Sequence, residues 1–204
     1  MRTALPRTLV VMALPAESDG VFEAAGVPVL FCGVGKVNAA IALTRELARY
    51  VHGGEPLPLV LNFGTAGSVV YGTGAVVACR EFIQRDMDVR GLGFPLGITP
   101  FDSAPPALEF EPVFDHLPTA TCGSGDSFAT AGSEAACGVV DMEAYALAKV
   151  CWLEGAAFAC AKYVSDGADV QAGADWQNNV HRAASEFLNL YQRVNGSRGG
   201  ARTL

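Results

Sequence analysis

The chain carries little charge for its length and no excess of positive charge. Of its 204 residues 17% are charged, and 14 Lys and Arg against 21 Asp and Glu give a formal net charge of −7. Proteins that bind nucleic acid through its phosphates present a basic patch. No basic stripe occurs along this sequence, so we expect no nucleic-acid partner. The apolar runs are too short to span a bilayer, so we also expect no membrane partner.

The sequence also lacks a metal-binding pattern. Its six cysteines lie mostly within apolar runs and no two of them form a Cys-x-x-Cys pair. Its three histidines are scattered without ligand spacing. This pattern is typical of reduced core thiols in a cytoplasmic protein, and it predicts no metal site.

What the sequence has is an alternation of short apolar runs with helical patterns. The runs predict strands at residues 9–14, 27–32, 59–63, 74–88, 119–124 and 156–164. Helices are expected at 16–25, 37–50, 141–153 and 175–193, with a loop at 91–117. Such alternation predicts a three-layer α/β/α sandwich with a mixed, mostly parallel central sheet. We expect one domain over residues 1–194 and a disordered tail over 195–204.

Two glycine-rich segments follow predicted strands. The first, Gly-Val-Gly-Lys-Val-Asn at 33–38, is close to a dinucleotide-binding fingerprint, but Asn38 stands at the third glycine. It also follows the second strand, so an ordinary strand-to-helix turn is favoured. In the helix after it, Val37, Ile41 and Leu47 are expected to share one apolar face. The second segment, Gly-Thr-Ala-Gly at 64–67, is expected to be a tight turn.

Three acidic residues lie at predicted strand or helix ends. Glu17 follows the first strand, Glu143 is near the start of a helix, and Asp166 ends a buried strand. Each has an ordinary explanation in helix-end electrostatics or turn capping. Ligands of open α/β sheets bind at the carboxyl ends of strands, so three acids at such ends favour a site. Phe128 and Trp176 flank polar loops, where they are either core residues or an apolar wall for a purine.

Seven segments of the chain, taken in order, match one known family. They are Ala-Leu-Pro-Ala-Glu at 13–17, the glycine segment at 33–40, Asn-Phe-Gly-Thr-Ala-Gly at 62–67, Asp-Met-Asp-Val at 86–89, Ser-Gly-Asp-Ser-Phe at 124–128, Val-Asp-Met-Glu at 140–143 and Ser-Asp-Gly-Ala-Asp at 165–169. On these residues the chain resembles the nucleoside phosphorylase and nucleosidase superfamily. Within it, the closest resemblance is to the bacterial 5′-methylthioadenosine/S-adenosylhomocysteine nucleosidases.

The resemblance implies a reaction and a role for each matching residue. The reaction is hydrolysis of the N-glycosidic bond of a purine nucleoside, most simply methylthioadenosine or S-adenosylhomocysteine, without a cofactor. Glu17 matches the carboxylate that activates water, and Asp166 matches the acid that protonates the purine at N7. The matching substrate contacts are Glu143 and Met142 on the ribose, Phe128 and the backbone of Ala129 on the base, Thr65 near the nucleophile, Ser165 beside Asp166, and Trp176 over the 5′ substituent.

The resemblance leaves alternatives open. Phosphorylases of this superfamily hold phosphate with arginine, one of them at the position of Asn62, so an amide there and Glu17 nearby favour water as the nucleophile. Lys162 stands where the nucleosidases carry arginine, and the 5′ group is not fixed by sequence. Futalosine hydrolysis, another purine nucleosidase or phosphorylase activity, and nucleoside binding without catalysis remain alternatives. Family members are dimers, which implies a homodimer with residues 88–96 at the interface.

Overall fold

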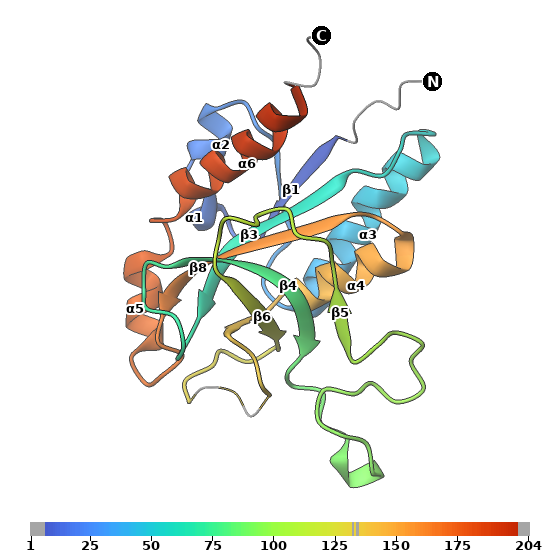
Figure 1. Cartoon of the computed structure of the whole chain (residues 1–204), viewed down its shortest axis with the longest axis vertical. Coiled ribbons are helices and arrows are strands. Elements are labelled where there is room, and N and C mark those ends of the chain that lie inside the picture. Colours follow the sequence, from blue (N-terminus) through green and yellow to red (C-terminus); the bar gives the residue numbers. More distant parts are fainter. Residues whose placement is uncertain (1–6, 132, 134, 200–204) are drawn as a thin grey trace.

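The computed structural model describes residues 7–131, 133 and 135–199 (Figure 1). The strands are β1 (Thr8–Met12), β2 (Val29–Phe31), β3 (Leu59–Gly67), β4 (Val76–Gln84), β5 (Ala107–Glu109), β6 (Thr119–Ser124), β7 (Val139–Asp141) and β8 (Phe158–Asp166). The helices are α1 (Pro15–Ser18), α2 (Val21–Ala24), α3 (Lys36–His52), the short 3₁₀ helix η1 (Arg90–Leu92), α4 (Ala144–Glu154), α5 (Ala172–Asn179) and α6 (Ala184–Gly199). None of the described helices has both the length and the apolar character needed to cross a bilayer.

The sheet is mixed and mostly parallel, as expected. Strand β1 lies between β2 and β3 in parallel, and β3 continues in parallel to β8. The antiparallel pairs are β4 with β8, β4 with β5, and β3 with β7. Because β4 also pairs with β6, and β6 with β7, the pairing β3–β8–β4–β6–β7 returns to β3. Gly67, at the end of β3, pairs with both Asp166 of β8 and Val140 of β7, so three strands meet there.

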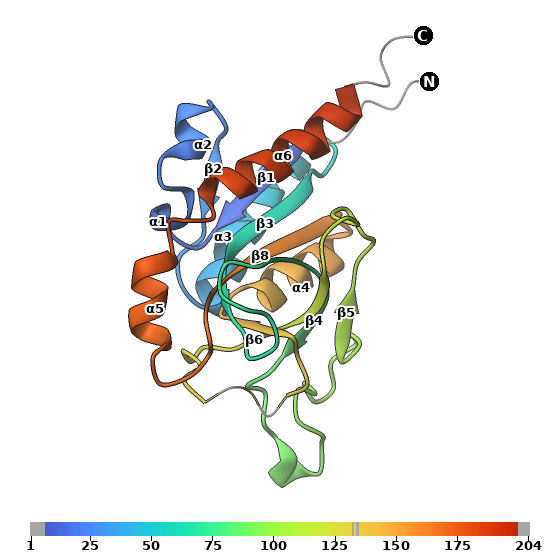
Figure 2. The same cartoon turned by 60° about the vertical axis from the view of Figure 1, so that its left-hand side comes forward.

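Helices cover both faces of this sheet, which confirms the three-layer sandwich (Figures 1 and 2). On one face α3 and α4 pack together and bury Leu43, Leu47 and Leu147. On the other face α2 and α6 bury Phe22 and Phe187 against the sheet, and the Phe187 ring stacks on that of Phe63 of β3 with centroids 5.1 Å apart. Two aromatic and aliphatic cores therefore hold the sheet from either side.

The face of α3 is not the one that the sequence pattern indicated. Ala39, Leu43 and Leu47 are its buried residues, at a spacing of four that forms one stripe. Val37 and Ile41 are 66% and 46% exposed instead. The predicted apolar face was therefore wrong at Val37 and Ile41 and confirmed at Leu47, and the helix leaves two β-branched side chains on the surface.

Several element boundaries also differ from expectation. The helix expected at 16–25 is two short helices, because Asp19 and Gly20 take left-handed backbone conformations with φ of 45° and 70°. The helix expected at 175–193 is likewise two helices, α5 and α6. The loop at 91–117 contains β5, and β7 precedes α4, where the sequence indicated only a helix from residue 141.

The Gly-Thr-Ala-Gly segment at 64–67 is not a turn but the last part of β3, paired with β8 over its whole length. Its glycines provide space rather than a bend. A Cβ on Gly64 would lie 3.0 Å from a carboxylate oxygen of Glu17, and one on Gly67 would lie 2.6 Å from an oxygen of Asp166. A larger residue at either position would displace an acidic side chain, because Glu17 and Asp166 approach the strand backbone closely.

The tail was expected from residue 195, but residues 195–199 are helical, since α6 continues to Gly199. Both the oxygen and the nitrogen of the Asn195 side-chain amide form hydrogen bonds. Its Nδ2 donates to the carbonyl of Tyr191, and its Oδ1 accepts from the Thr8 hydroxyl at the start of β1. Buried Val194 packs beside it. The rest of the expected tail, residues 200–204, lies outside the described residues.

Candidate active site

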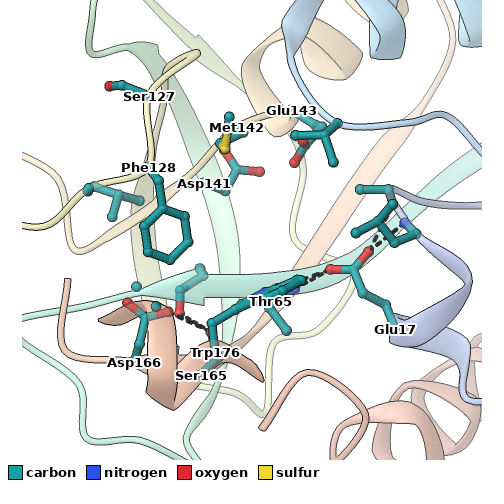
Figure 3. A pocket seen from close by; sticks show the side chains of 18 of the residues that line it. Glu17, Thr65, Ser127, Phe128, Asp141, Met142, Glu143, Ser165, Asp166 and Trp176 are labelled. Atoms are coloured by element: carbon teal, nitrogen blue, oxygen red, sulfur yellow. Dashed lines mark hydrogen bonds between the residues drawn. The ribbon is translucent and has the colours of Figure 1, made fainter. Parts of the chain in front are cut away.

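A cavity of about 340 Å³ opens where β3, β7 and β8 meet (Figure 3). All nine residues that the sequence singled out as catalytic or substrate-binding line this cavity. They are Glu17, Thr65, Phe128, Ala129, Met142, Glu143, Ser165, Asp166 and Trp176. Figure 3 shows Asp166 and Phe128 at one side, Glu17 at the other, and Glu143 with Met142 across from Thr65 and Trp176. The fold therefore brings six separate segments of the chain to one space.

Glu17 is held at the end of β1 by hydrogen-bond donors alone. One carboxylate oxygen accepts from the backbone N–H groups of Ala13 and Leu14, at 2.9 and 3.2 Å. The other accepts from the backbone N–H of Thr65 at 2.8 Å and from its hydroxyl at 3.1 Å. The residue is only 4% exposed. An ionised carboxylate is purely an acceptor, so these four donors suit the charged form of Glu17.

Asp166 ends β8 at the other side of the cavity. Its Oδ2 accepts from the Ser165 hydroxyl at 2.7 Å, and its Oδ1 accepts from the backbone N–H of Ala168 at 3.0 Å. Asn179 of α5 donates to the Ser165 carbonyl at 2.9 Å and so fixes the end of the strand. Asp166 is 3% exposed yet lines the cavity, so one edge of its carboxyl group faces the open space.

Glu143 is placed across the cavity by the turn before α3. Its Oε1 accepts from the backbone N–H of Gly35 at 2.8 Å. Burial raises the pKa of Glu143 to about 7, and the negative charge of Asp141 adds to this effect. A carboxyl group with such a pKa changes its charge near neutral pH.

Asp141 and Lys162 form a buried ion pair beside Glu143. The Lys162 Nζ lies 2.8 Å from an Asp141 oxygen, and both side chains are almost fully buried. Burial alone would lower the pKa of Lys162, but the Asp141 carboxylate keeps it well above the usual value. Burial would raise the pKa of Asp141, but the charge of Lys162 holds it below the usual value. Lys162 is not among the cavity-lining residues, whereas its partner Asp141 is.

The loop after β6 carries Phe128, which is 46% exposed. Arg85 anchors this loop, because its guanidinium donates to the carbonyl of Ser127 and to the Ser127 hydroxyl. The arginine lies flat on Gly125, where a Cβ would come within 2.9 Å of the guanidinium carbon. Sequence reasoning missed Arg85, and the glycine two residues before Ser127 is the signal that could have indicated a packed side chain.

An ionic cluster outside the cavity joins this loop to the turn before α3. Lys36 Nζ pairs with Asp86, which follows β4, and lies 3.7 Å from Asp126, which follows β6. The backbone N–H of Lys36 donates to Asp126 at 2.7 Å, and that of Asp126 donates to Asp86 at 2.8 Å. The 33–38 segment is therefore a strand-to-helix turn, as expected. It also positions Glu143 through Gly35.

The cavity is rich in acidic groups and poor in cationic ones. Arg85 is the sole cationic side chain among its described lining residues, and its guanidinium is engaged with the loop. Asn62 does not reach the cavity: its Nδ2 donates to the carbonyl of Val11, and its Oδ1 accepts from the Cys160 thiol. Within the described part of the chain, no group of three or more His, Cys, Asp and Glu side chains is arranged to hold a metal ion.

Comparisons with known proteins identify the family of the chain. A family model described as the phosphorylase superfamily matches residues 21–125. A 5′-methylthioadenosine/S-adenosylhomocysteine nucleosidase of Exiguobacterium sp. is 30% identical over 191 residues, covering 82% of this chain and 79% of the relative.

Two solved structures of Helicobacter pylori proteins share the fold. A mutant 5′-methylthioadenosine/S-adenosylhomocysteine nucleosidase with 5′-methylthioadenosine in the active site has a TM-score of 0.80 at 19% identity, covering 95% of this chain and 100% of that one. A futalosine hydrolase mutant has a TM-score of 0.81 at 20% identity, with the same coverage. The chain therefore belongs to the phosphorylase superfamily and, within it, to the family of 5′-methylthioadenosine/S-adenosylhomocysteine nucleosidases.

Proposed function

We propose that this protein hydrolyses the N-glycosidic bond of a purine nucleoside, with 5′-methylthioadenosine or S-adenosylhomocysteine as substrate and adenine as the released base. The observation that carries the proposal is the placement of Glu17 and Asp166 at opposite sides of one cavity, with Glu143 between them (Figure 3). The names of its relatives support the same reaction.

In the proposed reaction the base lies against Phe128 and the backbone of Ala129, with its N7 toward Asp166. Glu17 accepts a proton from a water molecule as the water oxygen attacks C1′. The C1′–N9 bond breaks, and Asp166 delivers its proton to N7 so that adenine leaves as a neutral molecule. Positive charge develops on the ribose ring in such a cleavage, and a general acid and a general base at its two sides are the groups it needs.

Glu143 and Met142 are the proposed ribose contacts. An ionised Glu143 accepts hydrogen bonds from the two ribose hydroxyls, and its negative charge stabilises the cationic ring in the transition state. Because the pKa of Glu143 is about 7 and its protonated form lacks the charge, Glu143 can take this role only above about pH 7. Thr65 lies between Glu17 and Trp176, which closes the cavity on the side of α5.

Water rather than phosphate is the proposed nucleophile. A phosphate dianion needs charge-assisted hydrogen bonds, usually from arginine. Arg85 is engaged with the carbonyl of Ser127, and Asn62 is neutral and directed between strands. Glu17 would repel an anion at the position of attack.

We also propose that the protein is a cytoplasmic homodimer. The six cysteines are all unpaired, as expected in a reducing compartment. Large apolar side chains are exposed before and at the start of α3 and in the segment between β4 and β5. They are Val34, Val37, Ile41, Leu92 and Phe101. Exposed apolar side chains that gather into a patch are typical of a subunit contact.

The dimer is tested by Leu92→Asp, because Leu92 is 73% exposed and its loss leaves the monomer core intact. Phe94, within the expected loop 88–96, packs its ring on Phe101 instead, so it is a poorer probe. We expect the variant to elute as a monomer in size-exclusion chromatography with light scattering, and Val51→Asp on the far end of α3 to remain dimeric. A wild-type monomer would refute the dimer.

The reaction is tested by release of adenine from 5′-methylthioadenosine with and without added phosphate. Release at the same rate in both conditions, with 5-methylthioribose as the sugar product, is the expected result. Formation of a ribose 1-phosphate would show phosphorolysis and refute water as the nucleophile. Turnover of futalosine but not of methylthioadenosine would show a futalosine hydrolase activity, as in the name of the second solved structure. Tight binding without turnover of any of these nucleosides would show a binding protein.

A further inference from the structure

Three residues from distant parts of the chain form a hydrogen-bonded chain that ends on Glu17. The indole Nε1 of Trp176 donates to the Thr65 hydroxyl oxygen at 3.1 Å. The Thr65 hydroxyl donates to Glu17 Oε1 at 3.1 Å. Trp176 lies on α5, Thr65 on β3 and Glu17 on α1, and all three line the cavity (Figure 3). Helix α5 is thereby connected to Glu17 through Thr65 of β3.

The chemistry of the three groups fixes the direction of every proton in this chain. An indole N–H is a donor only, and an ionised carboxylate is an acceptor only. A threonine hydroxyl has one proton, which it can direct to only one partner at a time. Because Trp176 donates to the Thr65 oxygen, the hydroxyl proton is left for Glu17. Hydrogen-bonded chains of this kind also polarise one another, so the indole strengthens the bond that Glu17 receives.

We infer that Trp176 and Thr65 are positioning residues for Glu17, an inference that rests on the proposed function. Three backbone N–H groups already hold the Glu17 carboxylate, and among the described residues the Thr65 hydroxyl is its one side-chain hydrogen-bond donor. The hydrogen bond from Trp176 keeps the Thr65 hydroxyl directed at Glu17. The lone pairs of Glu17 that remain free then face the cavity, where the attacking water must lie. A phenylalanine at this position would supply the same apolar wall but not the hydrogen bond.

Turnover distinguishes this role from that of a simple wall. Trp176→Phe keeps an aromatic ring, and we expect it to lower kcat about fivefold, since one hydrogen bond contributes about 1 kcal/mol, while KM changes little. Thr65→Val should lower kcat by at least as much. Thr65→Ser, which keeps the hydroxyl, should have a kcat near that of the wild type. Adding Trp176→Phe to Thr65→Val should cause no further loss, because the chain is already broken. Trp152→Phe and Thr119→Val, on the surface of α4 and at the exposed start of β6, are the matched controls.

The indole N–H supplies a signature that does not depend on activity. The chain has two tryptophans, so a Trp152→Phe variant leaves one indole resonance in a ¹⁵N-resolved NMR spectrum. We expect that resonance to exchange slowly with solvent and to shift and exchange faster in Thr65→Val, but not in Thr119→Val.

The inference would be overturned if the indole N–H of Trp176 exchanged rapidly with solvent and its resonance were the same in Thr65→Val. Independent, additive losses of kcat in Trp176→Phe and Thr65→Val would overturn it as well. If the wild type released no purine at all, the proposed function would fail, while the NMR arm would still decide whether the chain of hydrogen bonds exists. If the wild type were active and the NMR and kinetic arms were negative, only the positioning role would fail.

Discussion

The two sides of the cavity are built in different ways. Glu17 is held by the backbone N–H groups of Ala13 and Leu14, directly after β1, and of Thr65 near the end of β3. Phe128 is half exposed on a loop whose anchor is a single arginine side chain, Arg85, with the Lys36 cluster behind it. Backbone donors fixed in a sheet do not rearrange, whereas a loop held by side chains can adjust.

The difference has a functional meaning for the proposed reaction. The proton transfer to Glu17 demands fixed geometry, while the base has to enter and leave past Phe128. We therefore expect substitutions among the groups that hold Glu17 to act on kcat, and substitutions among the groups that hold the Phe128 loop to act on KM. Each prediction below can break or sharpen this division.

The largest effect is expected from Glu17→Gln. The amide keeps the size of the side chain but cannot accept the proton of water, and it brings an N–H group against donors at Thr65 and Ala13. Loss of a general base lowers turnover by roughly 10²- to 10⁴-fold. Steady-state release of adenine measures this loss, and adenine binding should be retained. Glu23→Gln, exposed on α2, serves as the control, and a Glu17→Gln variant with full kcat would remove Glu17 from the mechanism.

A smaller and pH-dependent effect is expected at Glu143. Since its pKa is about 7 and its charged form is the one proposed to bind ribose, kcat/KM of the wild type should fall as pH decreases through 7. Glu143→Gln should lower kcat/KM by roughly ten- to hundred-fold, the cost of about 1.5–3 kcal/mol for a charged hydrogen bond. It should also remove that limb of the pH profile. An unchanged profile in Glu143→Gln would assign the limb to another group.

The same carboxyl group links stability to pH. Its folded pKa is raised from 4.5 to about 7, so its favourable contribution is complete below pH 4.5 and is lost as pH rises through 7. At pH 8 Glu143→Gln should therefore unfold at a higher temperature than the wild type, with a free energy of unfolding larger by at most about 3 kcal/mol. Near pH 4 this difference in stability should vanish. Thermal unfolding at the two pH values measures this, with Glu154→Gln at the exposed end of α4 as control.

The smallest of these effects is expected from Arg85→Met. Loss of its hydrogen bonds to Ser127 frees the loop that carries Phe128, so KM should rise roughly fivefold, at about 1 kcal/mol, while kcat stays near that of the wild type. Arg80→Met is the matched control, because Arg80 is exposed on β4, the strand that Arg85 directly follows. A loss confined to kcat would contradict the division between the two sides of the cavity.

The alternation of strands and helices predicted the fold class, and the nine residues that the family resemblance singled out line one cavity, because Glu143 and Asp166 lie at the ends of strands that meet there. It predicted less well where local pattern and tertiary contact conflict. The Gly-Thr-Ala-Gly segment resembles a turn, yet its glycines make room for Glu17 and Asp166 within a strand. The contributions of Arg85 and of the Asp141–Lys162 pair depend on side chains that meet across strands, which no local pattern contains.

The central claim is that Glu17 acts on the water and Asp166 on the leaving base. The most direct test compares two substrates, 5′-methylthioadenosine and a 4-nitrophenyl 5-methylthioriboside, whose nitrophenolate leaves without a proton. We predict that Asp166→Asn loses nearly all turnover of the first substrate but keeps most turnover of the second, while Glu17→Gln loses both. Equal loss of both substrates in Asp166→Asn, or nitrophenolate release by Glu17→Gln at the wild-type rate, would contradict the account.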